Sequence, residues 1–319
     1  MTAKLEQWLC PVCEAKRIAL IAHVSPDGDT VGAVLALRLA FLSMGKDVDV
    51  ICESPAPASL SFLPGIEAFL TPDAAKGPYD AAVAVDVSDR RLLGKADVVF
   101  DGAARRLVID HHGTNPGYGE YNYIRGDECA CCVLAYEAIE AMGAEVTPEI
   151  GTCLMTGMST DTGHFMYPYT TPLAFEIAGK LRAKGVDVSF ITRMLYRTVP
   201  MTKMNLTRRA YQKMRFELGG RVGVIELTKE DFAETGATLQ QTDGLVNKAL
   251  EVEGVRMAIL ATQREDGVKL SLRAVEPDTV SDVAKAFGGG GHAQAAGVSM
   301  QMSMDDAVAA VLAEMEKKL

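Results

Sequence analysis

Short apolar runs alternate with amphipathic segments along the first two-thirds of the chain. Four apolar runs are predicted to be strands, and the first ends in polar residues, as a buried parallel strand does. These runs are residues 17–23, 47–52, 81–87 and 106–110. Apolar residues recur at helical spacing over residues 29–44, 131–142, 148–160, 171–184 and 189–197. This alternation predicts an α/β domain with a mostly parallel sheet and helices on both faces.

The pattern changes after a further helix predicted at residues 201–214. Strands are expected at residues 221–227, 255–263 and 268–274, the last two joined by a hairpin, and helices at 242–250, 280–287 and 304–317. This order predicts a smaller α+β domain. Two domains also suit a chain of 319 residues. We therefore expect a first domain over residues 1–195, a linking helix over 196–216 and a second domain over 217–319.

The composition is that of a globular protein with a sizeable core, since 48% of the residues are hydrophobic and 23% are charged. No apolar run reaches the roughly 18 residues that a membrane-spanning helix needs, and the N-terminal residues do not form a signal peptide. The seven cysteines are irregularly spaced, which disfavours a disulfide framework. The sequence therefore predicts a cytoplasmic protein that has no membrane segment.

The charge is acidic overall but uneven. A formal net charge of −10 argues against tight binding of long nucleic acids, which need a broad basic surface. Residues 180–221, however, hold eleven Lys and Arg residues against Asp187 and Glu217. This segment is either a solvated helical face, the usual case for a charge run, or a basic surface for an anionic substrate.

Acidic residues and histidines cluster in four short segments, mostly where predicted strands end. They are His23, Asp27 and Asp29, then Asp86, then Asp110, His111 and His112, and finally Asp161 in the segment TGMSTDTGHF. Carboxylates buried together need a counter-charge, which two divalent cations would supply. Carboxylate and imidazole ligands suit Mn²⁺ or Zn²⁺, and a carboxylate-rich set favours Mn²⁺ or Mg²⁺. Such a pair of ions activates water for in-line attack on phosphorus.

Each of these residues also has an ordinary structural explanation. Asp29 could cap a helix, Asp86 could belong to a turn, and a lone His23 could be a structural histidine. The joint occurrence of all four segments in one chain is what favours a metal site.

A second element is the run Gly288, Gly289, Gly290 and Gly291, followed by His292. Glycines let the backbone approach an anion closely and direct successive N–H groups at it. The alternative is a flexible linker, but the run is short, lacks serine and is flanked by a predicted helix and a small-residue segment. Arg273 is a candidate phosphate clamp; otherwise it is a surface residue of a strand.

The motifs resemble those of a known superfamily. HVSPDGDTVGA, AVDVSD, IDHHGTN and STDTGHFMY resemble the four motifs of the DHH phosphoesterases, and SLRA with GGGGHAQAAG resembles their associated substrate-binding domain. The resemblance spans about residues 17–300. It is strongest to the members that hydrolyse short oligoribonucleotides and 3′-phosphoadenosine 5′-phosphate (PAP). RecJ exonucleases share both domains but are longer, and family II pyrophosphatases lack the GGGGH segment.

The resemblance implies a role for each residue. One metal would be held by His23, Asp27 and Asp86, and the other by Asp29, Asp86, His111 and Asp161. Asp110 would orient its neighbours, and His112 would contact the scissile phosphate or the leaving oxygen as an electrophile or general acid. Arg273, the glycine run and His292 would bind substrate. His164 departs from the usual pattern, and we expect it to face solvent. Cys10 and Cys13 suggest zinc only weakly, because a lone CPVC lacks a second ligand pair.

The expected function is hydrolysis of short RNA (nanoRNA) to mononucleotides and of PAP to AMP and phosphate, with two divalent ions, Mn²⁺ favoured. The active site would lie in a cleft between the domains. Alternatives are a phosphodiesterase for linear or cyclic dinucleotides in signalling, a RecJ-like single-strand exonuclease, and a non-catalytic RNA-binding module. The sequence leaves open the preferred metal, the direction of cleavage, the ranking of substrates and the oligomeric state, a homodimer included.

Overall fold

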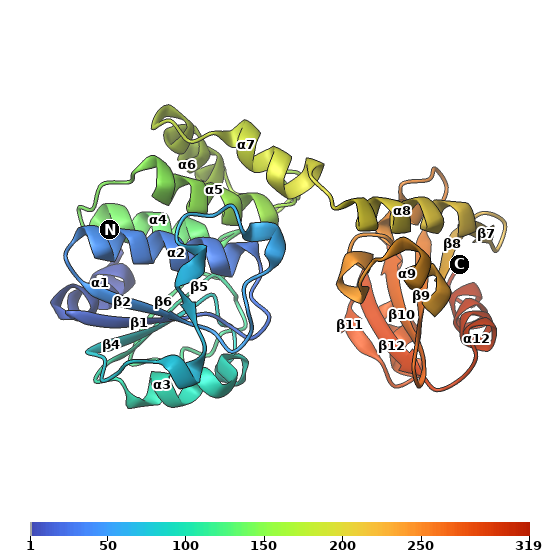
Figure 1. Ribbon diagram of the computed structural model, residues 1–319, viewed down its shortest axis with the longest axis horizontal. Coiled ribbons are helices and arrows are strands. Elements are labelled where there is room, and N and C mark those ends of the chain that lie inside the picture. The colour runs from blue at the N-terminus through green and yellow to red at the C-terminus, as the bar shows by residue number, and fades with distance from the viewer. Residues whose placement is uncertain (1) are drawn as a thin grey trace. The chain divides into compact units, whose positions relative to one another are not determined.

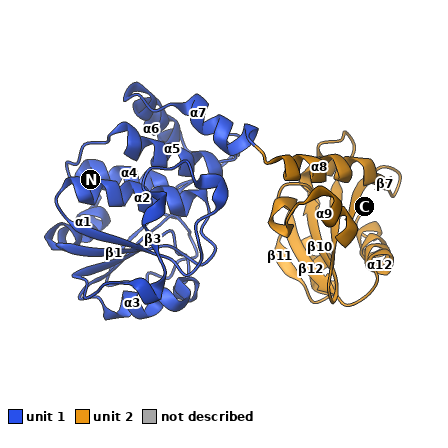
Figure 2. Ribbon diagram, in the orientation of Figure 1, with its two compact units in different colours: residues 1–198 blue, residues 199–319 orange. Residues whose placement is uncertain are grey.

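The computed structural model describes residues 2–319 and divides into two compact units. The division falls between Thr198 and Val199 (Figure 2). We call the part before it unit 1 and the part after it unit 2. Within the described residues, every helix is too short or too polar to cross a membrane.

Unit 1 contains a six-stranded parallel sheet with the strand order β3-β2-β1-β4-β5-β6. Most of its strands are labelled in Figure 1. The strands are β1 (Arg17–Ile21), β2 (Asp47–Ile51), β3 (Phe69–Leu70), β4 (Ala81–Val85), β5 (Arg106–Asp110) and β6 (Tyr121–Ile124). The strand order reverses at β1, which pairs with β2 on one side and with β4 on the other. In open α/β sheets, ligands bind outside the carboxyl ends of the strands at such a reversal.

Helices cover both faces of this sheet. The larger core includes residues of α1 (Ala3–Glu14), α2 (Gly28–Ser43), α4 (Cys131–Ala141), α5 (Pro148–Asp161) and α6 (Pro172–Ala183). The smaller core, on the other face, is closed by the 3₁₀ segment η4 (Arg90–Ala96) and α3 (Asp97–Gly102). Helix α7 (Val188–Thr192) continues into the π-helical turn η5 (Arg193–Arg197).

Several helices begin at capping residues that the sequence supplies. The side chain of Asp27 accepts hydrogen bonds from the N–H groups of Asp29 and Thr30 at the start of α2. Thr147 and Thr171 cap α5 and α6 in the same way, and each is followed by proline at the first helical position. Such caps satisfy backbone donors that the helix itself leaves free.

Unit 2 contains a mixed six-stranded sheet with the order β11-β12-β10-β9-β8-β7. The strands are β7 (Arg215–Glu217), β8 (Val222–Leu227), β9 (Met257–Arg264), β10 (Gly267–Ala274), β11 (Gly290–His292) and β12 (Ala295–Met300). One face packs on α11 (Ser281–Ala286) and α12 (Met304–Glu316). The opposite face of β8 and β9 packs on α8 (Met201–Lys213) and α10 (Asn247–Leu250), while α9 (Lys229–Thr235) lies beside α8.

The predicted fold class is confirmed, with a parallel α/β sheet followed by a smaller α+β unit. The helix expected to link the domains corresponds to α8, but its Leu206 and Ala210 are buried in the core of unit 2. The helix expected at 242–250 is wrong over its first part, because α10 covers only Asn247–Leu250 and a 3₁₀ turn at Leu239–Thr242 precedes it.

Candidate metal centre

The acidic residues and histidines singled out in the sequence converge at the carboxyl ends of β1, β4 and β5 and at the end of α5. Their ligand atoms form three groups, and within each group all the atoms lie within 4.8 Å of one another. The groups are Asp86, His111 and His112; His23, Asp27 and Asp86; and Asp29, His111 and Asp161. Asp86 and His111 each belong to two groups, so the three groups form one continuous cluster.

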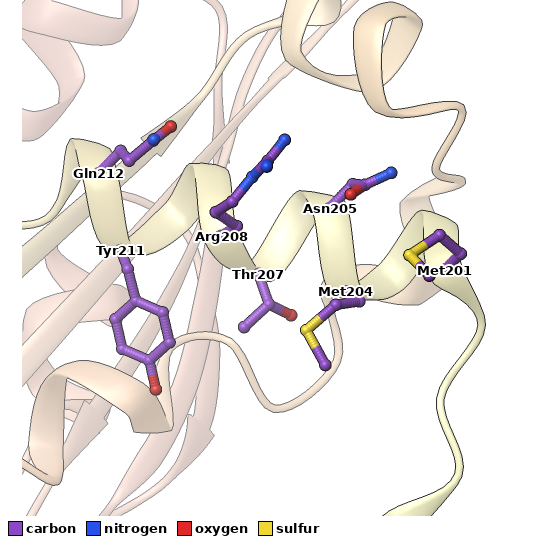
Figure 3. A pocket seen from close by; sticks show the side chains of 7 residues that line it. All are labelled: Met201, Met204, Asn205, Thr207, Arg208, Tyr211 and Gln212. Carbon is purple, nitrogen blue, oxygen red and sulfur yellow. The ribbon is translucent and has the colours of Figure 1, made fainter.

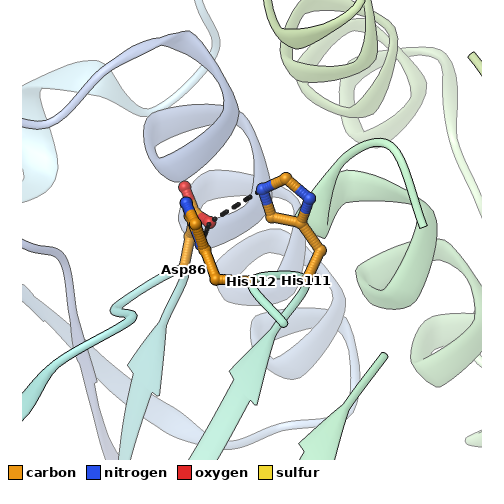
Figure 4. Close-up of side chains that lie close together, drawn as sticks. All are labelled: Asp86, His111 and His112. Atoms are coloured by element: carbon orange, nitrogen blue, oxygen red, sulfur yellow. Dashed lines mark ion pairs between the residues drawn. The ribbon is translucent and has the colours of Figure 1, made fainter. Parts of the chain in front are cut away.

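Asp86 lies at the centre of this cluster, directly after β4. Its backbone has a φ of +60°, which is unusual for a residue other than glycine and marks local strain. Its buried Oδ2 accepts a hydrogen bond of 2.7 Å from Thr30. Its Oδ1 finds no hydrogen-bond partner within residues 2–319, although His111 Nε2 and His112 Nδ1 each lie 3.5 Å away (Figure 4). A buried carboxylate oxygen that has no hydrogen-bond donor is suited to bind a cation.

Two histidines present one ring nitrogen to the cluster because the other is already bonded. His111 Nδ1 donates to the backbone carbonyl of Glu128 at 3.1 Å, and its Nε2 faces Asp161 Oδ2 at 3.2 Å. His23 Nδ1 donates to the carbonyl of Val24 at 2.7 Å. These carbonyl bonds fix the tautomer that leaves Nε2 free, which is how metal-binding histidines are usually held.

The carboxylate of Asp29 is held by the N-terminus of α4, which comes much later in the chain. Its two carboxylate oxygens accept the N–H groups of Cys131 at 2.5 Å and Cys132 at 3.0 Å, at the beginning of α4. The N-terminus of a helix favours a negative charge. Asp29 is fully buried, so its carboxylate is shielded from solvent.

The carboxylates of the cluster repel one another. Burial raises the pKa of Asp29 well above its usual range, and the nearby Asp161 and Asp86 raise it further. Burial also raises the pKa of Asp86, against the opposing effect of His111. Burial and the neighbouring carboxylates raise the pKa of Asp161 to about 7, again opposed by His111. A pair of divalent cations would supply the missing positive charge, and the carboxylate and imidazole donors fit such ions.

Asp110 contacts His112 rather than the histidine predicted to bind metal. Its Oδ1 accepts from His112 Nδ1 at 2.8 Å, and its Oδ2 accepts from the side chain of Asn115 at 2.5 Å. The hydrogen bond to Asp110 raises the pKa of His112 to about 9. Asp110 therefore fixes the ring of His112, while the carbonyl of Glu128 fixes that of His111.

Comparison with known proteins places the chain in a family. The N-terminal domain of the DHH family matches residues 17–158, and the DHHA1 domain matches residues 220–319. A Thermus thermophilus protein named "Bifunctional oligoribonuclease and PAP phosphatase NrnA" is 32% identical over 305 residues, which are 95% of this chain and 90% of that protein. The chain belongs to the DHH family.

Two further likenesses extend over nearly the full length of this DHH protein. A Bacillus subtilis protein with the same name is 23% identical over 94% of this chain and 93% of its own. The crystal structure of an "exopolyphosphatase-related protein" from Bacteroides fragilis superimposes with a TM-score of 0.90 at 27% identity, covering 99% of this chain and 96% of that one.

His164, which lies within the fourth DHH motif, does not face solvent as the sequence suggested. Its Nδ1 lies 3.0 Å from Ser159 Oγ, and its ring packs on Tyr196 with centroids 5.1 Å apart. Tyr196 OH in turn donates to the carbonyl of Ser159 at 2.8 Å. These contacts brace the last turn of α5, which carries Asp161.

The predicted substrate residues of the DHHA1 domain share one row of its sheet. Arg273 on β10 and His292 on β11 both pair with Ala295 of β12, so all three side chains project from the same face. Arg273 also lines a pocket with Lys269 and Ser271, which precede it at alternate positions of β10. The sequence interpretation missed these two, although the strand alternation places them on the same face as Arg273.

The glycine run differs from the expected open loop. Gly290 and Gly291 form part of the edge strand β11, and the N–H groups of Gly288 and Gly289 donate to carbonyls at the end of α11. A Cβ atom on Gly291 would lie 2.4 Å from the carbonyl oxygen of Ala295. Glycine is therefore required for close approach to β12, and the first two N–H groups are not available to an anion.

One face of α8 in the DHHA1 unit is exposed and partly apolar (Figure 3). Met201, Met204 and Tyr211 follow one another along it at helical spacing, with Arg208 between them. Within the described residues of unit 2, nothing covers this face.

Proposed function

We propose that the chain is a metal-dependent phosphoesterase that hydrolyses short oligoribonucleotides to mononucleotides and PAP to AMP and phosphate. The observation that carries the proposal is the unpartnered, buried Oδ1 of Asp86, shared between ligand groups in a DHH protein. The substrates follow from relatives of nearly full length that bear both activities in their names.

Two sets of residues would hold the ions. His23, Asp27 and Asp86 would bind one, and Asp29, Asp86, His111 and Asp161 would bind the other. When bound, the two ions would offset the carboxylate charge, polarise the phosphoryl group and make water a stronger nucleophile. Mn²⁺ is the metal we favour, because carboxylates outnumber histidines in both sets.

His112 has a different task. Its side chain is 43% exposed, so it can reach a substrate, and Asp110 and Asn115 fix its orientation. It contacts the phosphate under attack or donates a proton to the leaving oxygen. Asp110 acts through His112 and does not touch the substrate.

The DHHA1 domain binds the end of the substrate away from the reacting bond. Arg273 on β10 can hold a phosphate with two parallel hydrogen bonds. His292 and the free edge at Gly290 and Gly291 belong to β11, which β12 separates from β10. The net charge of −10 suits a short substrate better than a long polyanion. The enzyme would act in the cytoplasm.

The test is hydrolysis of an RNA trimer and of PAP by the full chain, with Mn²⁺, with Mg²⁺ and with a chelator. Both substrates are expected to be hydrolysed with Mn²⁺ and to survive with the chelator. Asp86→Ala should lose at least about nine-tenths of the activity, because no neighbour replaces a shared ligand. Asp127→Ala is the matched control, since Asp127 is exposed and makes one long ion pair with Arg125. A wild-type chain inert with both metals would refute the proposal.

A further inference from the structure

The segment that follows Asp161 folds into a compact loop with unusual backbone conformations. Gly163, His164 and Phe165 have successive φ values of +55°, +61° and +62°. Positive φ costs free energy at the two residues that are not glycine. Local hydrogen bonds hold this conformation, since Thr162 accepts the N–H groups of both Met166 and Tyr167 at 3.0 Å.

The loop presents two tyrosine rings to solvent. Tyr167 is 47% exposed and Tyr169 is 57% exposed, and their ring centroids lie 5.5 Å apart at 40°. The Tyr167 ring packs directly on Gly163, where a Cβ atom would lie 2.5 Å from it. The two rings are therefore held in a fixed arrangement even though they are exposed. We call Tyr167 and Tyr169 the tyrosine pair.

The tyrosine pair is attached to the candidate metal centre. The hydroxyl of Tyr169 donates to the backbone carbonyl of Asp161 at 2.9 Å. The carboxylate of the same Asp161 lies 3.2 Å from His111 Nε2 within the cluster. One residue thus joins the exposed rings to the atoms that would hold a metal.

A fixed aromatic surface beside a phosphate-binding centre suits one kind of ligand. A nucleotide whose phosphate lies at the metals carries its base a few bonds away, and a base stacks on aromatic rings whatever its sequence. We propose that the tyrosine pair is a stacking platform for the nucleobase next to the scissile phosphate. The inference rests on the proposed function and adds to it a base subsite within unit 1.

The platform also has a consequence for specificity. Stacking uses the face of the base and not its hydrogen-bonding edge, so all four bases would be accepted. An enzyme that degrades short RNA of any sequence needs this tolerance. Substrates without a base at that position would lose the stacking contribution.

The experiment compares diadenylate with analogues in which one or the other base is absent. Wild type, Tyr167→Ala, Tyr169→Ala and Tyr167→Phe are assayed with Mn²⁺. The alanine variants should raise KM for diadenylate about thirtyfold, the mid-range for one lost stacking contact, and should match wild type on one of the two abasic analogues. Tyr167→Phe keeps the ring and should behave as wild type. Phe216→Ala, which removes an exposed ring from β7, is the matched control.

Three results would overturn the inference. In the first, the alanine variants still prefer diadenylate over both analogues as wild type does. In the second, all substrates slow equally and the Mn²⁺-induced rise in unfolding temperature shrinks, so that the pair only supports Asp161. In the third, the variants change oligomeric state on gel filtration but keep their base preference, so that the surface contacts protein. Failure of the wild-type chain to hydrolyse any of these substrates would instead refute the proposed function itself.

Discussion

Atom Oδ1 of Asp86 lies 3.5 Å from Nε2 of His111, across the ends of the neighbouring strands β4 and β5. The aspartate oxygen has no hydrogen-bond partner within residues 2–319, and the histidine has its other nitrogen bonded to a carbonyl. Both atoms therefore face a common point with their lone pairs free. A divalent metal ion is expected to bind at that point.

Metal binding should stabilise the fold through Asp86. The buried carboxylates destabilise the metal-free protein, because burying like charges without a counter-charge is costly. Excess Mn²⁺ at about one hundred times its dissociation constant would add about 2.7 kcal/mol of stability. In thermal unfolding, Mn²⁺ should raise the wild-type midpoint over that in chelator. Asp86→Asn should raise the metal-free midpoint and reduce the Mn²⁺ response, whereas Asp127→Asn should change neither. An undiminished response in Asp86→Asn would mean that Asp86 does not bind the ions.

His112 and Asp110 should act as one unit in catalysis. Because Asp110 fixes the ring of His112, Asp110→Asn should lower kcat mainly by misplacing His112. A lost general acid costs about a hundredfold or more. The double variant should be no slower than His112→Ala alone, and all three proteins should bind as much Mn²⁺ as wild type. Multiplying losses in the double variant would mean that Asp110 acts independently of His112. A missing metal ion in His112→Ala would show that His112 is a ligand instead.

Arg273 and His292 should affect substrate binding and alignment without affecting the metals. Removing a charge-assisted Arg–phosphate contact costs about 1.5–3 kcal/mol. Arg273→Ala and His292→Ala should therefore raise KM and lower kcat on dinucleotides, since remote binding energy aligns the reacting bond. Hydrolysis of bis-p-nitrophenyl phosphate, which lacks the distant phosphate, should be nearly unchanged. Arg264→Ala is the control at the far end of the neighbouring β9. Equal losses on the dinucleotides and on bis-p-nitrophenyl phosphate would mean that the DHHA1 domain shapes the metal centre.

Unit 2 should lose stability in acid through Asp231. Burial alone would raise the pKa of this carboxyl, but hydrogen bonds from Lys213 and from the N–H group of Thr228 outweigh it, and the pKa is lowered. Its contribution is present above the unfolded pKa of about 3.9 and is lost as the pH falls through the lower folded value. Urea unfolding followed by circular dichroism should find Asp231→Asn destabilised by about 1–3 kcal/mol at pH 7. The difference should shrink near pH 2, and a constant difference would contradict the assignment.

The sequence was a good guide where one strand or helix carries its own signal. The apolar run 106–110 ends in Asp110, and β5 covers the same residues. Helix α1 was missed because Pro11 and two exposed cysteines obscure its buried side, which includes Trp8. Strand β12 was missed because it begins with two alanines and a glycine, which have low β-propensity. The strand forms because it pairs with β10.

The surroundings of the candidate site depended on contacts that no local pattern contains. The carboxylate of Asp29 is held by N–H groups more than one hundred residues away, at the start of α4. The motifs identified Asp110 and His111 but could not say that Asp110 bonds to His112 and that Glu128 orients His111. Nearly every residue carries the same backbone N–H and C=O groups, so the residue types do not show which of these groups will bond to a site side chain.

The most direct measurement of the central claim is a product time course on end-labelled RNA of two to twenty-four nucleotides. Wild type with Mn²⁺ should convert oligomers of two to five nucleotides to mononucleotides much faster than a 24-mer, because an acidic protein with a limited substrate surface gains little from a long polyanion. Asp86→Ala should leave every length intact. Equal rates on a 3-mer and a 24-mer would indicate a RecJ-like single-strand exonuclease and would contradict the proposed preference for short RNA.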